Sequence, residues 1–189
     1  MNNGKALIFS APSGSGKTTI VKHLIKNYPQ LAFSISATTR APRTGIEKDG
    51  VDYHFIESQD FKSKIENDEL VEWEEVYEGI CYGTLKSEVD RIWNQNQVVL
   101  FDVDVKGGLN LKEYFGDQAL AIFVKAPDIE TLKGRLKKRK TESAADLQKR
   151  LNKIEEELTY EDKFDLVIVN DDLETSLKEA ETVTQEFIK

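Results

Sequence analysis

The chain has 189 residues, and 26 lysines and arginines against 34 aspartates and glutamates give it a formal net charge of −8. This acidic balance excludes a general nucleic-acid binder and a protein that adheres to anionic membranes, because both need basic surfaces. A chain of this length can bury one full hydrophobic core, and 39% hydrophobic with 32% charged residues is typical of an ordinary globular protein. The single cysteine, Cys81, excludes an intrachain disulfide and a multi-cysteine zinc site.

The N-terminus lacks a basic region followed by a long apolar stretch, and the apolar runs elsewhere are far shorter than a membrane span. We therefore expect a cytoplasmic protein that has neither a membrane nor a nucleic acid as its partner. The sequence leaves the choice between a monomer and a homo-oligomer undecided.

Short apolar runs rich in β-branched and aromatic residues alternate with helical patterns along the chain. Such runs, when helices follow them, are typical of buried parallel strands. The predicted strands are 6–10, 98–104, 120–126 and 166–171, and a run at 32–36 can join them. Apolar spacing predicts helices over 17–28, 147–158 and 173–187. Alternation between 52 and 77 predicts a small β-containing insertion, so we expect an α/β fold with a parallel sheet flanked by helices and an added lobe.

The segment "APSGSGKT" at 11–18 connects the first predicted strand to the first helix. It matches the phosphate-binding loop pattern G-x-x-x-x-G-K-[ST], except that Ala11 replaces the first glycine. The two glycines let backbone N–H groups turn toward a β-phosphate, and the helix N-terminus adds a positive dipole end. Lys17 would reach the β- and γ-phosphates, and the Thr18 hydroxyl would bind Mg²⁺. The predicted nucleoside triphosphate site consists of Pro12, Ser13, Gly14, Ser15, Gly16, Lys17, Thr18 and Thr19.

The segment 34–55 carries two arginines, Arg40 and Arg43, with Pro42 between them to stiffen the loop. Residues with hydroxyl groups surround them. Arginine forks and hydroxyls suit a phosphate monoester, because its oxygens accept several hydrogen bonds at once. This segment is therefore a candidate second phosphate site.

Two carboxylates, Asp102 and Asp104, stand at the end of the predicted strand 98–104. In this position, beside a phosphate loop, carboxylates can hold a hydrated Mg²⁺ and nearby groups, and alternation puts both on one side of the strand. We favour Asp102 for metal or substrate positioning and give Asp104 a supporting role. No nucleophile or general base stands out, and His23 and His54 are expected to be structural. The expected mechanism is positioning with electrostatic stabilisation.

Several motifs taken together resemble the guanylate kinase family in order and spacing over nearly the whole chain. They are "APSGSGKT", "SATTRAPR", "DYHF", "VEW", "YGT", "DVDVKG", "RLKKR" and "VIVNDD". The resemblance implies Mg²⁺-dependent transfer of a phosphoryl group from ATP to GMP, which gives ADP and GDP. It also implies three parts, which are a core at about 1–36, 88–127 and 161–189, a GMP-binding lobe at about 37–87 and a helical lid at about 128–160.

The resemblance assigns the GMP site to particular residues. Those that would hold the GMP phosphate are Arg40, Arg43, Tyr53 and Tyr82, and those that would read guanine are Ser36, Glu72 and Thr84, with Asp102 and Asp104 beside them. Glu72 can accept hydrogen bonds from both N1–H and the exocyclic amino group of guanine, a donor pair that adenine lacks. A hydroxyl of Ser36 or Thr84 can donate to O6 of the base.

The same resemblance explains the basic segment 133–150. Arg135 and Arg139 lie one helical turn apart and point the same way, and Arg150 follows on the next predicted helix. These arginines would close over the triphosphate and stabilise charge on the transferring phosphoryl group. The expected catalytic residues are Lys17, Arg40, Asp102, Arg135, Arg139 and Arg150. Asn170 follows the last predicted strand, where the family contacts the adenine end of ATP.

Two alternatives stay open, namely another nucleoside monophosphate kinase and a noncatalytic guanylate-kinase-like module that binds proteins. The intact lysine and threonine of the phosphate loop oppose the module, and Glu72 opposes a different monophosphate. A small GTPase is excluded, because the string nearest to its N-K-x-D motif, at 152–155, ends in glutamate. The chain departs from the common family pattern at Ala11, Cys81, Lys106 and Lys140.

Overall fold

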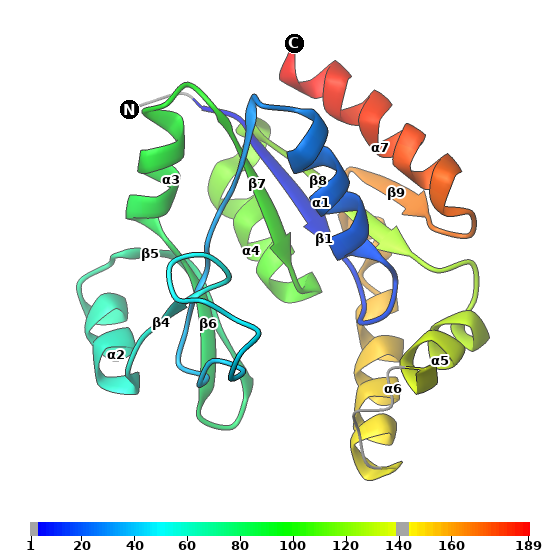
Figure 1. Ribbon diagram of the computed structural model, residues 1–189, viewed down its shortest axis with the longest axis horizontal. Helices are drawn as coiled ribbons and strands as arrows, with labels where there is room; N and C mark the ends of the chain where they lie inside the picture. The colour runs from blue at the N-terminus through cyan, green and yellow to red at the C-terminus, as the bar shows by residue number, and fades with distance from the viewer. Residues whose placement is uncertain (1–3, 139–143) are drawn as a thin grey trace.

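The computed structural model describes residues 4–138 and 144–189, apart from the side chains of Tyr77 and of residues 136–138 and 144–150. Two sheets and the helices around them make up this part of the chain (Figure 1). Arg139 and Lys140, which the sequence singled out, lie outside the described residues, as does the side chain of Arg150.

The central sheet has five parallel strands in the order β2-β7-β1-β8-β9. Their bounds are β1 Ala6–Ser10, β2 Leu31–Phe33, β7 Val98–Val103, β8 Ala119–Lys125 and β9 Leu166–Val169. This confirms the predicted parallel sheet. The strand predicted at 32–36 is shorter than expected, because the chain leaves the central sheet after Phe33 and enters the second sheet at Ala37.

Helices cover both faces of the central sheet, and the alternation of β1 shows how. Ala6 and Ile8 point to one face and pack with α3 (Lys86–Trp93) and α4 (Val105–Phe115). Leu7 and Phe9 point to the other face and pack with α1 (Lys17–Asn27) and α7 (Leu173–Ile188). A strand buried on both faces must be apolar throughout, which is why these runs could be recognised in the sequence.

The second sheet has the order β4-β3-β6-β5 and mixes parallel and antiparallel pairs. Its strands are β3 Ala37–Thr38, β4 His54–Phe55, β5 Leu70–Tyr77 and β6 Ile80–Leu85. It also carries a helix that the sequence analysis missed, α2 (Ser58–Glu66), whose Phe61 packs against Ala37 and Leu70. The β-containing insertion expected at 52–77 is therefore real, but its sheet begins at Ala37 and ends at Leu85.

Two helices follow β8, namely α5 (Ile129–Lys138) and α6 (Ala144–Leu158). Leu132 of α5 and Ile154 of α6 are buried together in a small cluster of their own. Short 3-10 helices occur at η1 (Gly116–Gln118) and η2 (Glu161–Lys163). None of the helices in the described part of the chain has the length and apolar character that a membrane crossing requires.

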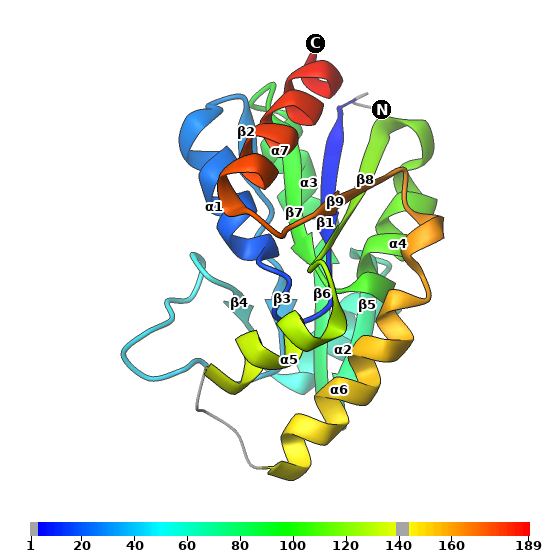
Figure 2. The same cartoon turned by 90° about the vertical axis from the view of Figure 1, so that its right-hand side faces the viewer.

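Both the second sheet and the α5–α6 pair lie beyond the carboxyl ends of β1 and β7, whereas the last turn of α7 lies at the opposite end of the central sheet (Figures 1 and 2). In open α/β sheets, ligands bind at the carboxyl ends of the strands. The fold thus brings the phosphate loop, the second sheet and the α5–α6 pair together at the carboxyl ends of the central strands.

Candidate active site

The phosphate loop joins β1 to α1. Gly14 and Gly16 have φ values of +91° and +94°, in the left-handed region that favours glycine. A Cβ atom on Gly16 would lie 2.2 Å from Nδ2 of Asn170, so any other residue at this position would also have to displace the Asn170 side chain. The backbone conformation that the glycine spacing predicted is therefore present at the start of α1.

Three side chains from the loop and from β7 meet beside it. Lys17 Nζ forms an ion pair with Asp102 and donates to the carbonyl oxygen of Val103. Thr18 Oγ1 donates to Asp102 Oδ2 at 2.8 Å. The structure therefore brings Asp102 to Lys17 and Thr18, although it lies 84 residues from Thr18 in the sequence.

Asn170 and Arg135 contact the backbone of the phosphate loop from the other side. Asn170 is 4% exposed, and its Nδ2 donates to the carbonyl oxygen of Ser15 at 2.7 Å. Arg135 donates to the same oxygen at 3.4 Å and to the carbonyl oxygen of Asn170 at 3.0 Å. A cavity of about 290 Å³ adjoins them, lined also by Leu173. The cap of α7 is Asp172, which accepts from the Thr175 amide, so Asn170 is left to serve the loop.

The residues predicted to hold a phosphate in the second site do gather, and they surround a carboxylate. Arg40 Nε donates to the Tyr82 hydroxyl at 3.1 Å, and its guanidinium lies over the Tyr53 ring at 5.5 Å from the ring centroid. Both terminal nitrogens of Arg40 donate to Glu47 at 2.9 Å. The Arg43 amide donates to the same carboxylate at 2.8 Å.

Glu47 is a site residue that the sequence analysis missed. Its hydrogen bonds with Arg40 lower the pKa of its carboxyl, whereas burial raises the pKa of the Tyr53 phenol. The only signal in the sequence is an acid four residues after Arg43, which does not separate it from other loop acids. Its place depends on how the loop folds back on Arg40.

Glu72 and Thr84, two of the residues predicted to read guanine, face each other across the β5–β6 pair. Thr84 Oγ1 donates to Glu72 Oε1 at 2.7 Å, and Thr84 itself is fully buried. Burial raises the pKa of Glu72 to about 7. Asp104 caps α4 by accepting from the Gly107 amide at 2.9 Å, and its charge adds to the rise in the Glu72 pKa.

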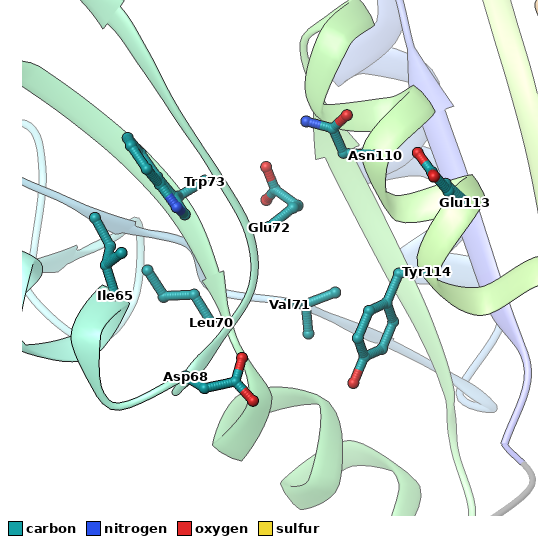
Figure 3. Close-up of a pocket in the computed structure, with 9 residues that line it drawn as sticks. All are labelled: Ile65, Asp68, Leu70, Val71, Glu72, Trp73, Asn110, Glu113 and Tyr114. Carbon is teal, nitrogen blue, oxygen red and sulfur yellow. The ribbon is translucent and has the colours of Figure 1, made fainter.

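A cavity of about 520 Å³ lies between β5 and α4, and Glu72 lines it together with Asn110 and Tyr114. Figure 3 shows the Glu72 side chain pointing toward α4, while Trp73 on the neighbouring position points the other way. The carboxylate thus meets open space as well as Thr84, which leaves room for a ligand to reach it.

Charged residues that the sequence analysis did not single out connect α6 to this region. Lys153 lies 3.5 Å from Asp104 and 3.6 Å from Glu157. Burial raises the pKa of Glu157 to about 7, and burial together with the Asp104 carboxylate raises the pKa of Glu74 to about 7. Alternation along β5, which puts Glu74 on the same face as Glu72, is the one signal that could have pointed to it.

Three of the departures from the family pattern can be placed. Ala11 is buried and packs with the α1 side of the central sheet, where a methyl group fits. Cys81 packs against the Phe61 cluster of the second sheet and its amide donates to Thr39 Oγ1 at 2.9 Å. Lys106 pairs with Glu156 of α6 at 3.1 Å. These departures therefore occupy packed or paired positions.

Comparisons with known proteins agree on one family. The guanylate kinase family model matches residues 3–187. The guanylate kinase of Bacteroides thetaiotaomicron is 50% identical over 98% of this chain and 90% of its own length. That of Porphyromonas gingivalis is 48% identical over 97% of this chain and 98% of its own length. The crystal structure of guanylate kinase from Anaplasma phagocytophilum superposes with a TM-score of 0.75 at 26% identity, covering 97% of this chain and 85% of that one.

These matches favour neither a different nucleoside monophosphate kinase nor a noncatalytic module. Each of the three named relatives is a guanylate kinase, and the matches extend over the phosphate loop, the second sheet and the α5–α6 region alike. The chain belongs to the guanylate kinase family, whose members transfer a phosphoryl group from ATP to GMP.

Proposed function

We propose that the chain transfers the γ-phosphoryl group of ATP to GMP with the residues described above as its site. The observation that carries the proposal is the Glu72–Thr84 pair, which the second sheet holds together with the Arg40 cluster, while the phosphate loop lies at the carboxyl end of β1. One end of the site is then suited to a nucleoside triphosphate, and the other end is suited to guanosine monophosphate. The proposed parts are a core at 1–36, 88–127 and 161–189, a GMP-binding lobe at 37–87 and a lid at 128–160.

The way in which the site would recognise guanine follows from its hydrogen-bond donors and acceptors. The Thr84 hydroxyl donates its single hydrogen bond to Glu72 Oε1, so it orients the carboxylate and has no donor left for O6 of guanine. Glu72 accepts from N1–H and the exocyclic amino group of the base, and Ser36 is left as the hydroxyl that donates to O6. A base without this donor pair leaves a buried carboxylate without two of its hydrogen-bond donors, which makes discrimination steep.

The GMP phosphate is held by Arg40, Arg43, Tyr53 and Tyr82. Since the Arg40 fork already holds the Glu47 carboxylate, the arriving phosphate takes over part of a preformed anion site. Phosphate and carboxylate both match the planar fork of a guanidinium. Because the GMP phosphate is ionised at neutral pH, no enzyme base is needed to activate it.

At the other end, the phosphate loop binds ATP, with Asn170 and Arg135 fixing the loop from behind. Lys17 leaves Asp102 to reach the β- and γ-phosphates. Arg135, and by the family resemblance Arg139 and Arg150, stabilise charge on the phosphoryl group in transit. Binding of both substrates brings the lid and the GMP lobe together over the reacting groups.

The donor atoms beside the loop fit a magnesium ion. Thr18 Oγ1 and Asp102 Oδ2 lie 2.8 Å apart, and hydroxyl and carboxylate oxygens are ligands that Mg²⁺ accepts along with phosphates and water. In the described residues no cluster of three or more His, Cys, Asp or Glu gathers to form a metal cage. When bound, Mg²⁺ would neutralise charge on the β- and γ-phosphates. A cytoplasmic location and the absence of a nucleic-acid partner stay predictions from the sequence.

The test is a coupled assay that follows ADP formation from ATP and Mg²⁺ with and without GMP. We expect ADP formation to depend on GMP, and to be at least about a hundredfold slower with AMP, UMP or dTMP at equal concentration. Absence of GMP-dependent ADP formation would refute the proposed function.

A further inference from the structure

A buried carboxylate lies outside the candidate active site, where the chain passes between the two sheets. The chain crosses once at residues 34–36, between β2 and β3, and again where β6 gives way to α3 at Lys86. Glu88, in the first turn of α3, is 6% exposed. A charged side chain this deeply buried needs partners, because burial disfavours its ionised form.

Glu88 finds its partners on both crossings. Its Oε1 accepts from the backbone amide of Ile35 at 3.2 Å, and the Arg91 guanidinium donates to its two oxygens at 2.7 Å and 3.0 Å. Burial by itself would raise the pKa of Glu88, but the bonds from Arg91 and the Ile35 amide outweigh it and lower the pKa. The carboxylate is therefore ionised and ties the first crossing to the second.

The Ile35 amide matters because of what stands on either side of it. Ser34 still belongs to the central sheet through its amide, which donates to the Leu100 carbonyl oxygen at 3.0 Å. Ser36 already belongs to the second sheet, since its carbonyl oxygen accepts from the His54 amide at 2.9 Å. Ile35 is thus the joint between the two sheets, and Glu88 holds it from the core side.

We propose that Glu88 is a positioning residue for GMP. It fixes the Ile35 amide and thereby sets the place of Ser36, the next residue, whose hydroxyl donates to O6 of guanine. The inference rests on the proposed function, and within it on the role of Ser36. In the part of the chain that the structure describes, the backbone bonds of this joint reach Leu100, His54 and Glu88, none of which is assigned to the ATP site, so we expect the effect to be confined to GMP.

A purely structural role makes a different prediction. An acid in the first turn of α3 favours the helix dipole, and Glu88 and Arg91 form an i,i+3 ion pair. If Glu88 served only these purposes, its function would depend on its negative charge. If it positions Ile35, its function depends on a side chain long enough to place an acceptor oxygen at the Ile35 amide.

Two variants at the same position separate charge from reach. Glu88→Gln keeps an acceptor oxygen at the right length and loses the charge, whereas Glu88→Asp keeps the charge and withdraws the oxygen from the Ile35 amide. We expect Glu88→Asp to raise KM for GMP about five- to tenfold and Glu88→Gln to raise it no more than about twofold, with KM for ATP unchanged in both. Arg91→Gln is the matched control, since it removes the ion pair and leaves the Ile35 bond, and it should change KM for GMP by less than about twofold.

A double-mutant cycle with Ser36→Ala tests whether the effect passes through Ser36. Ser36→Ala should itself raise KM for GMP, and the combination with Glu88→Asp should be no worse than the larger single effect. The proposal is overturned if Glu88→Gln raises KM for GMP more than Glu88→Asp does. It is also overturned if the effects of Ser36→Ala and Glu88→Asp on KM for GMP are additive, or if KM for ATP rises in parallel. An unchanged KM for GMP in Ser36→Ala would overturn it as well, and in that case the fault would lie in the proposed role of Ser36. Thermal unfolding of each variant shows that the folded protein was measured. If Glu88→Asp is unstable, Glu88→Gln, which is close in shape to glutamate, still tests the proposal, because a rise in its KM for GMP above about twofold would overturn it.

Discussion

The guanidinium of Arg40 and the carboxylate of Glu47 meet in a two-point contact, with both nitrogen–oxygen distances at 2.9 Å. The Arg40 side chain is 18% exposed, and its Nε is taken by the Tyr82 hydroxyl, so the whole fork is held in one orientation. Arg43, which approaches the same carboxylate to 3.7 Å, is 69% exposed. The two arginines, which the sequence analysis assigned to the same role, therefore differ: Arg40 is held in one orientation, and Arg43 is largely exposed.

This difference predicts unequal effects of removing them. Arg40→Met takes away an oriented fork that matches a phosphate, whereas Arg43→Met takes away a charge that solvent already screens. We expect Arg40→Met to lower kcat/KM for GMP by at least about a hundredfold and Arg43→Met to lower it by a smaller factor. Steady-state kinetics at saturating ATP measures both. Equal losses, or a larger loss for Arg43→Met, would contradict the assignment.

The Lys17–Asp102 ion pair leads to a prediction for catalysis. Lys17→Ala removes the cation proposed to bind the β- and γ-phosphates, so we expect kcat to fall by about a thousandfold or more while the protein stays folded. Lys22→Ala, which changes an exposed lysine of the same helix, should leave kcat unchanged. The measurement is kcat together with the thermal unfolding midpoint of each variant. Near-normal turnover in Lys17→Ala would refute the role of the loop lysine.

Glu72 can be tested by a change that keeps its shape. Glu72→Gln replaces one acceptor oxygen with a donor, which then faces the donor pair of guanine. We expect KM for GMP to rise about tenfold or more and KM for ATP to stay within about twofold. Glu69→Gln, at an exposed position just before β5, serves as the control. If GMP kinetics are the same in Glu72→Gln and in the parent protein, Glu72 does not read the base.

The pH dependence of GMP binding follows from the raised pKa of Glu72, which burial moves to about 7. Below this pH the carboxyl is protonated and can no longer accept both guanine hydrogen bonds, so KM for GMP should rise as the pH falls from about 7.5 to 5.5. Glu72→Gln should flatten the profile. A flat profile in the parent protein would contradict the assignment.

The raised pKa of Glu72 affects the stability of the folded protein in the opposite direction, because a higher pH is expected to favour GMP binding but to lower stability. A carboxyl whose folded pKa exceeds its unfolded pKa binds its proton more tightly in the folded protein. The ligand-free protein should therefore lose stability as the pH rises from about 4.5 toward 7, and Glu72→Gln should lose less. Thermal unfolding across this range is the measurement, and a loss that is equal in the two proteins would assign the effect to Glu74 and Glu157 instead.

The sequence predicted those parts of the fold in which a strand is buried on both faces. Strands β1 and β8 are apolar at every position except the last, which is Ser10 in one and Lys125 in the other, so their runs stand out. Helix α2 was missed because Phe61 and Ile65 are its only apolar residues, and a single pair four residues apart makes no sustained periodic pattern. The alternation at 52–77 placed the start of the second sheet too late, because β3 has only two residues and gives no pattern of its own, although the family resemblance put the lobe at about 37–87.

The candidate site divides in the same way. Lys17 and Thr18 belong to a motif of fixed spacing, and Asp102 ends a recognisable strand, so their meeting could be expected. Glu47 and Glu88 could not be found, because a lone acid in a loop or on a helix is typical of an exposed residue. Their importance comes from tertiary contacts, with Arg40 in one case and the Ile35 amide in the other.

The central claim is that this chain selects guanosine monophosphate, GMP, as the phosphoryl acceptor. The most direct measurement is kcat/KM for GMP, AMP, UMP and dTMP with ATP and Mg²⁺, in the parent protein and in Glu72→Gln. The account predicts that kcat/KM for GMP exceeds that for each of the others by at least about a hundredfold in the parent protein, and that Glu72→Gln lowers this ratio. A comparable kcat/KM for any other monophosphate in the parent protein would contradict it.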